Sequence, residues 1–70
     1  MSRTIKIISE VAEEGGAFVA LTDNGKVRIG YRNMSYVESD SAAFADLANT
    51  AASMGEDELE DAVSDALRAA

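Results

Sequence analysis

The Asn24-Gly25 pair is the sequence feature that most constrains the fold. It stands between two short runs, residues 17–23 and 26–32, that are rich in residues common in β-strands. Asn-Gly is the preferred pair for a two-residue type I′ turn, whose twist matches that of the strands it joins. The sequence therefore predicts an antiparallel hairpin that is closed by these two residues.

A two-residue turn also predicts the register of the hairpin. It places Ala20 opposite Ile29 and Phe18 opposite Tyr31. The face expected to lie in the core then consists of Phe18, Ala20, Thr22, Val27, Ile29 and Tyr31. The opposite face carries Val19, Leu21, Lys26, Arg28 and Arg32. A shift of one residue would exchange these assignments, because side chains alternate between the two faces of a strand.

The rest of the chain supplies further strands and two helices. Alternation predicts a strand over residues 3–11, followed by a turn at Gly15-Gly16, and residues 33–38 suit another short strand. Apolar residues at helical spacing predict helices over residues 41–54 and 56–69. The predicted fold is a single small α+β domain, residues 1–70. Its antiparallel sheet of three or four strands, residues 3–38, is followed by two α-helices packed on one face.

Capping signals and apolar stripes define the two helices. Ser39, Asp40 and Ser41 are N-cap candidates for the first helix, with Asp40 preferred, and Gly55 suits the C′ position at its end. The stripe of the first helix is Phe44, Leu47, Ala48, Ala51 and Met54, opposite Asp46, Asn49 and Ser53. The stripe of the second helix is Leu59, Ala62, Val63, Ala66, Leu67 and Ala70.

Charge is distributed unevenly along the chain. The net charge is −7, yet residues 1–37 hold four acids and five bases, whereas residues 38–70 hold nine acids and one base, Arg68. Six acids fall between Glu56 and Asp65, on about 15 Å of helix at about 1.5 Å per residue. This gives about one charge per 2.5 Å, compared with about one per 1.7 Å along duplex DNA. The sequence indicates a local anionic surface that suits a basic partner.

Two interpretations of this acidic helix remain open. The helix dipole stabilises acids in a first turn, which accounts for Glu56, Asp57 and Glu58, and a solvated polar face accounts for the others. Alternatively, the face binds a partner, because a helix built only for stability usually carries Glu–Lys pairs and Arg68 is its one cation. The candidate partner-binding residues are Asp57, Glu58, Glu60, Asp61 and Asp65.

The hairpin offers a second candidate surface. Val19, Leu21, Lys26, Arg28 and Arg32 would form a partner or dimer contact with aliphatic anchors and a cationic rim. The simpler interpretation is a solvent-exposed strand face on which Lys26 protects an edge.

Catalytic and metal-binding signals are missing from the sequence. With no His and no Cys, the chain lacks the commonest general base, the thiol nucleophile and a zinc-type ligand set. Glu58, Asp61 and Asp65 lack the loop geometry of a calcium site. We therefore expect no enzyme activity, no cofactor and no metal. No signal peptide or membrane span is visible, which favours a cytoplasmic protein, and the acidic charge argues against direct binding to nucleic acid or to an anionic membrane.

Small size, acidity and a small sheet followed by alanine-rich helix together resemble the small phage-encoded anti-CRISPR proteins. Met1-Ser2-Arg3-Thr4 before an apolar strand, and a hairpin containing Asn24-Gly25-Lys26-Val27, are similar to some inhibitors of multi-subunit type I systems. The resemblance covers layout over most of the chain and includes no shared motif, so it assigns no residue a role. It implies tight binding to a CRISPR effector complex, commonly at its DNA-binding surface.

The leading functional hypothesis is a non-enzymatic inhibitor of a host nucleic-acid-processing complex. The acidic helix would act as a DNA mimic and occupy a basic DNA- or RNA-binding site, in the cytoplasm of the host cell if the protein is phage-encoded. The alternative hypothesis is a small structural or assembly domain, or an antitoxin-like adaptor, that forms a homodimer through its hairpin face.

Overall fold

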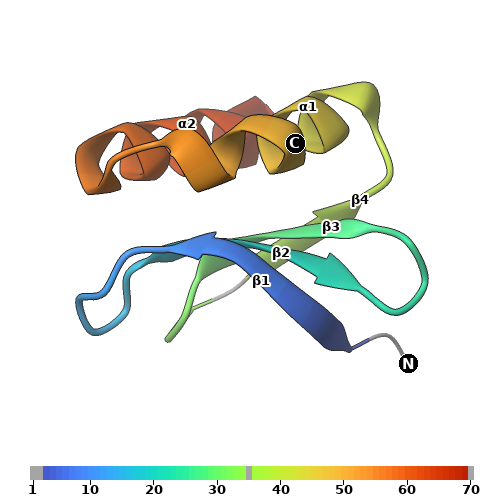
Figure 1. Cartoon of the computed structure of the whole chain (residues 1–70), viewed down its shortest axis with the longest axis horizontal. Coiled ribbons are helices and arrows are strands. Elements are labelled where there is room, and N and C mark those ends of the chain that lie inside the picture. Colours follow the sequence, from blue (N-terminus) through green and yellow to red (C-terminus); the bar gives the residue numbers. More distant parts are fainter. Residues whose placement is uncertain (1–2, 35, 70) are drawn as a thin grey trace.

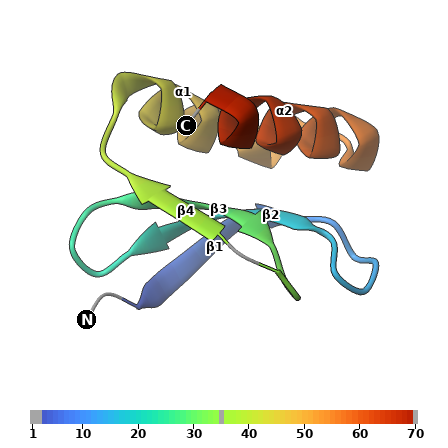
Figure 2. The same cartoon turned by 180° about the vertical axis from the view of Figure 1, so that it is seen from behind.

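A four-stranded antiparallel sheet carries two helices on one of its faces (Figures 1 and 2). The computed structural model describes residues 3–34 and 36–69. The strands are β1 (Thr4–Glu10), β2 (Ala17–Thr22), β3 (Val27–Tyr31) and β4 (Tyr36–Ser39), and each pairs with its neighbours in the chain. Helix α1 (Ala42–Thr50), a 3-10 turn (Ala51–Ser53) and helix α2 (Glu56–Ala69) follow. The α+β layout predicted from the sequence is confirmed, with four strands.

The β2–β3 hairpin is closed by a three-residue loop, so the prediction of a two-residue type I′ turn is wrong. The Thr22 N–H donates to the Lys26 carbonyl at 3.0 Å, and the Gly25 N–H donates to the Thr22 carbonyl at 3.2 Å. Gly25 has a φ of 80°, whereas no non-glycine residue among residues 3–34 and 36–69 has a positive φ. A type I′ turn needs positive φ at both central residues. The loop is instead a type I turn followed by a left-handed glycine.

The longer loop shifts the register by one residue from the predicted one. Val19 pairs with Ile29 and Leu21 pairs with Val27, whereas Ala20 pairs with Arg28. Val19 and Leu21 therefore join Val27 and Ile29 on the face that the helices cover. The predicted core face combined residues from opposite sides of the sheet, since Phe18, Ala20 and Thr22 alternate with these aliphatic residues along β2.

The main core lies between the sheet and the helices. Ile29 from β3, Phe44 from α1, and Leu59 and Val63 from α2 are buried in it. The complete buried cluster is Val11, Ala17, Val19, Val27, Ile29, Phe44, Ala51, Leu59 and Val63. Burial of these apolar groups supplies most of the favourable free energy of folding.

The helices largely follow their predicted stripes. The five stripe residues of the first helix are buried or pack against the core, as are Leu59, Val63, Ala66 and Leu67 of α2, and Ala62 is half-buried. Ala70, expected at the end of the second stripe, lies outside the described residues.

The predicted caps need two corrections. The N-cap of α1 is Ser41, not Asp40, because the Ser41 hydroxyl accepts the Phe44 N–H at 3.3 Å. Gly55 does not adopt the left-handed C′ conformation. The 3-10 turn ends the first helical segment, and the Gly55 carbonyl accepts the Leu59 N–H at 2.9 Å at the start of α2.

Candidate interaction surfaces

The outer side of α2 carries the predicted acidic face. Leu59 and Val63 point into the core, and this fixes which side of the helix faces solvent. All five predicted residues are exposed there: Asp57, Glu58, Glu60, Asp61 and Asp65. The 3.6-residue period of the stripe thus places these carboxylates outside the stripe that packs on the sheet. Figure 1 shows α2 lying on the helix-covered side of the sheet.

Few cations balance this acidic face. Arg68 lies 3.8 Å from the Asp65 carboxylate, but both side chains are about three-quarters exposed, so water and salt screen the pair. Within residues 3–34 and 36–69, Glu60 and Asp61 form no ion pair. Acids of the first turn, Glu56–Glu58, are stabilised by the helix dipole. The uncompensated charge is therefore concentrated at Glu60, Asp61 and Asp65.

The structure does not assemble the predicted hairpin face. Val19 is fully buried in the core and Leu21 packs against it. Lys26 lies beside the hairpin loop and is half-buried, Arg28 lies on the other side of the sheet, and Arg32 follows the end of β3. The expectation that Val19 and Leu21 are outward anchors is wrong, because the three-residue loop turns them toward the helices.

A different surface is formed by the side of the sheet that no helix covers, which we call the open face. Cross-strand pairing brings Glu10, Phe18, Gly30 and Tyr36 into one row and Ile7, Ala20, Arg28 and Glu38 into the next. A shallow hollow of about 310 Å³ lies on this face. Its lining consists of Thr4, Ile7, Glu10, Phe18, Arg28, Tyr31, Arg32, Met34 and Tyr36.

A glycine lies among the strand positions around the hollow. Gly30 lies in the register between Phe18 and Tyr36, two residues that line the hollow, and it contributes no side chain. A glycine inside a strand often marks a place where another group approaches the backbone closely. The open face therefore has a shallow depression lined by both apolar and polar groups, a shape suited to receiving a side chain of a partner.

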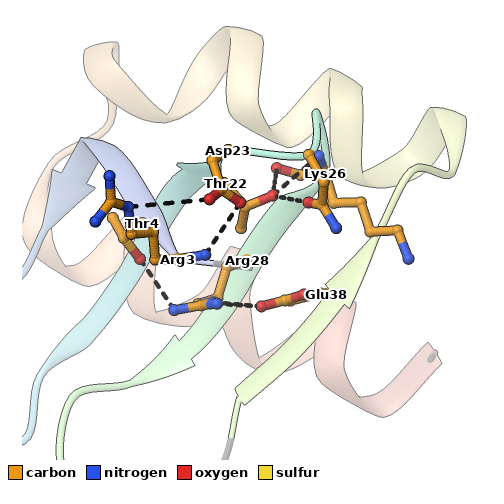
Figure 3. Close-up of polar contacts among 8 residues, drawn as sticks. Arg3, Thr4, Thr22, Asp23, Lys26, Arg28 and Glu38 are labelled. Atoms are coloured by element: carbon orange, nitrogen blue, oxygen red, sulfur yellow. Dashed lines mark hydrogen bonds and ion pairs between the residues drawn. The ribbon is translucent and has the colours of Figure 1, made fainter. Parts of the chain in front are cut away.

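Arg28 organises one side of the open face (Figure 3). Its Nε donates to the Glu38 carboxylate at 2.7 Å, its Nη2 contacts the same carboxylate, and its Nη1 donates to the Thr4 hydroxyl at 3.1 Å. The guanidinium also lies 4.3 Å from the centre of the Tyr36 ring, in cation–π geometry. Arg28 thus links β3 to the two edge strands, β1 and β4.

We expect the Arg28–Glu38 pair to stabilise the fold measurably. The two side chains are only 12% and 19% exposed, so removing either partner leaves the other charged group poorly solvated. Arg28→Met and Glu38→Gln should each lower the free energy of unfolding by about 1–3 kcal/mol. In a double-mutant cycle followed by urea unfolding, the coupling energy should be about 0.5–3 kcal/mol.

The exposed Asp65–Arg68 pair is the matched control for that cycle. Asp65→Asn and Arg68→Met should show coupling close to zero, because solvent screens this pair. Equal coupling in the two cycles would contradict a structural role for the Arg28 network.

Sequence reasoning missed the open face as a surface. Its larger apolar residues come from three separate segments: Ile7 from β1, the half-buried Phe18 from β2, and Met34 and Tyr36 from the region around the start of β4. The sequence did contain a signal for this surface. Shifting the predicted hairpin register by one residue puts Val19, Leu21, Val27 and Ile29 on one face. That all-aliphatic set is the better core, and choosing it turns Phe18 and Arg28 outward.

A scan against protein-family models and searches of curated proteins and of solved structures found no match to this chain. Within residues 3–34 and 36–69, neither helix has the length and apolar character needed to cross a membrane. The same residues contain no group of three or more carboxylates placed to hold a metal ion. The fold and its surfaces define a small α+β domain with an acidic helical face and an open sheet face.

Proposed function

We propose that this protein is a non-enzymatic inhibitor that binds a nucleic-acid-processing protein. The outer face of α2 would occupy a basic site that normally holds DNA or RNA phosphates. The observation that carries the proposal is the exposed group Glu60, Asp61 and Asp65, which lies beyond the first helical turn and is balanced by Arg68 alone on α2. Helix-end electrostatics do not account for carboxylates at these positions.

The way α2 is held supports this proposal. Leu59 and Val63 are fully buried against the sheet, so the helix presents its carboxylates from a fixed position. A surface that is already ordered loses less conformational entropy on binding than a flexible acidic tail.

The partner proposed more narrowly is a CRISPR effector complex in the cytoplasm of the host. This step rests on the resemblance in size, acidity and layout to small phage-encoded anti-CRISPR proteins. The same acidic face would suit the basic groove of another nucleic-acid-processing protein, so both belong in the binding experiment.

Charge on α2 would act mainly on the rate of association. Complementary surface potentials steer encounter and raise the on-rate, whereas lasting affinity depends on a few well-buried contacts. Binding should therefore weaken as salt rises, because the Debye length falls from about 10 Å at 0.1 M to about 3 Å at 1 M.

We expect the triple variant Glu60→Lys, Asp61→Lys and Asp65→Lys to associate at least about tenfold more slowly with purified effector complexes at low salt. The reason is loss of attraction to the cations of the target site. Surface plasmon resonance across a salt series measures the rates, and duplex DNA should compete with the unmodified protein. If the triple variant keeps the same affinity and the same dependence of affinity on salt concentration, the proposal is contradicted.

A matched control separates the acidic face from net charge. Asp46 is an exposed acid on α1, a different helix from the one that carries the acidic face. Asp46→Lys changes the net charge as much as Asp61→Lys. Asp61→Lys should slow association clearly more than Asp46→Lys. Equal effects would indicate general electrostatic attraction without a defined binding face.

A further inference from the structure

We infer that the open face is the interface of a symmetric homodimer. Both helices cover the opposite side of the sheet, so a second copy can approach this face directly (Figures 1 and 2). The inference does not rest on the proposed function, because the acidic face of α2 lies across the molecule and stays accessible in such a dimer.

Large apolar side chains are exposed around the hollow. Ile7 is 50% exposed, Tyr36 is 51% exposed and Met34 is 72% exposed, and all three line the hollow together with the half-buried Phe18. Scattered exposed apolar residues are ordinary on protein surfaces, but a group around one depression is characteristic of an interaction site. A domain of 70 residues also buries a small core, so an added apolar contact would contribute a relatively large share of its stability.

The charges of the open face favour a second copy as the occupant. Arg28 pairs with Glu38, and Arg32 lies 3.3 Å from the Glu10 carboxylate, so each cation has an acid beside it. Nucleic acid requires uncompensated cations, and a basic protein requires uncompensated acids. The open face of a second copy requires neither uncompensated cations nor uncompensated acids. Two α2 faces, in contrast, would repel one another.

The shape of the open face suits isologous packing, in which each copy contributes the same elements. The lining of the hollow includes Phe18 and Tyr36, the cross-strand neighbours of Gly30, and Met34, which is the most exposed large apolar side chain among the described residues. About a two-fold axis, Met34 of each copy would enter the hollow of the other copy. Methionine is unbranched and flexible, so it can fill an irregular depression.

The size of the molecule sets the scale of this interface. The Cα atoms extend over 28 × 22 × 21 Å, so one face can supply only a small interface, at or below the lower end of the range for specific interfaces, about 1,200 Å² in total. Buried area alone does not determine affinity, so the dissociation constant has to be measured over a wide range of protein concentrations.

Sedimentation velocity over protein concentrations up to about 1 mM tests the inference. The unmodified chain should show a concentration-dependent dimer that persists at high salt, because the interface is locally neutral. Met34→Glu should raise the dissociation constant at least about tenfold by placing a charge in the apolar hollow, and Met34→Ala should raise it less. Ala52→Glu adds the same charge at an exposed site in the helix layer and should leave the dimer intact.

Circular dichroism and thermal unfolding of each variant, measured at a concentration where all are monomeric, confirm that the fold is unchanged. A chain that stays monomeric throughout the concentration range overturns the inference. A dimer that Met34→Glu leaves untouched overturns it as well, because the interface then lies elsewhere. Loss of binding to a target protein by Met34→Glu, with the unmodified chain monomeric, assigns the face to that partner instead.

Discussion

Ile29→Ala should lower the free energy of unfolding by about 2–5 kcal/mol, which is a large share of the stability of a domain this small. Ile29 is 0% exposed and lies on a central strand, paired with Val19 on one side and Val37 on the other. The substitution removes three buried carbon atoms and leaves a cavity beneath the helices, where close packing limits relaxation. Urea unfolding followed by circular dichroism measures the change.

Ile5→Ala provides the matched control, because it removes the same atoms from a residue that is 63% exposed. Its effect should be about 1 kcal/mol or less, the scale of intrinsic strand preference. Similar losses in the two variants would contradict the placement of the core between the sheet and the helices.

Gly16→Ala should lower the free energy of unfolding by about 1–3 kcal/mol, the range for forced overpacking. A Cβ at Gly16 would lie 2.7 Å from the Val11 carbonyl oxygen, 2.8 Å from the Val11 Cβ and 2.9 Å from the Glu13 carbonyl oxygen. Two of these atoms belong to the backbone of the β1–β2 turn. The turn cannot yield freely, because the Val11 N–H donates to the Ala17 carbonyl and the Arg32 N–H donates to the Gly16 carbonyl.

Two other glycines separate this steric effect from backbone preference. Gly55 has open space around its Cα and no positive φ, so Gly55→Ala should be neutral or stabilising by about 0.4–1 kcal/mol. Gly25 also has open space but a φ of 80°, so Gly25→Ala should cost about 1–2 kcal/mol. Thermal unfolding of the three variants measures the differences. A loss in Gly55→Ala as large as that in Gly16→Ala would refute the close contact at Val11.

The helices could be predicted from sequence because their pattern is redundant. Helix α2 runs from Glu56 to Ala69, as expected, since several apolar residues at 3.6-residue spacing all indicate the same face. An error at one position would not rotate that face. For the same reason, the acidic residues were placed correctly on the outer side of α2.

Which side chains share a face of the hairpin could not be predicted in the same way. That assignment depends on whether Asn24, like Gly25, has a positive φ. Asn24-Gly25 is compatible with a two-residue type I′ turn and with a three-residue loop that has only Gly25 in the left-handed region. In the structure, the Thr22 hydroxyl accepts the Lys26 N–H at 3.1 Å and donates to the Asn24 side chain, which stabilises the longer loop. One added loop residue then reverses the side to which every β2 residue points.

Predicting the open face from the sequence would have required still more information than predicting the hairpin. Its residues come from all four strands, and β1 pairs with β2 through register shifts between Thr4 and Lys6 and between Ile7 and Ser9. Such irregularities leave little trace in the alternation of a short segment. Ile7 and Tyr36 could therefore be recognised as neighbours of Arg28 only once the pairing of the edge strands was known.

The order of the strands also bears on how quickly the chain can fold. Because the sheet is a simple meander, each strand pairs with the strand next to it in sequence, and forming the sheet requires only short loops to close. Short loops lose little entropy on closure, and folds dominated by such local pairings reach the native state faster than folds of similar size with distant pairings. The topology therefore lets this domain form quickly after synthesis and limits the time during which its strand edges and apolar faces stay uncovered.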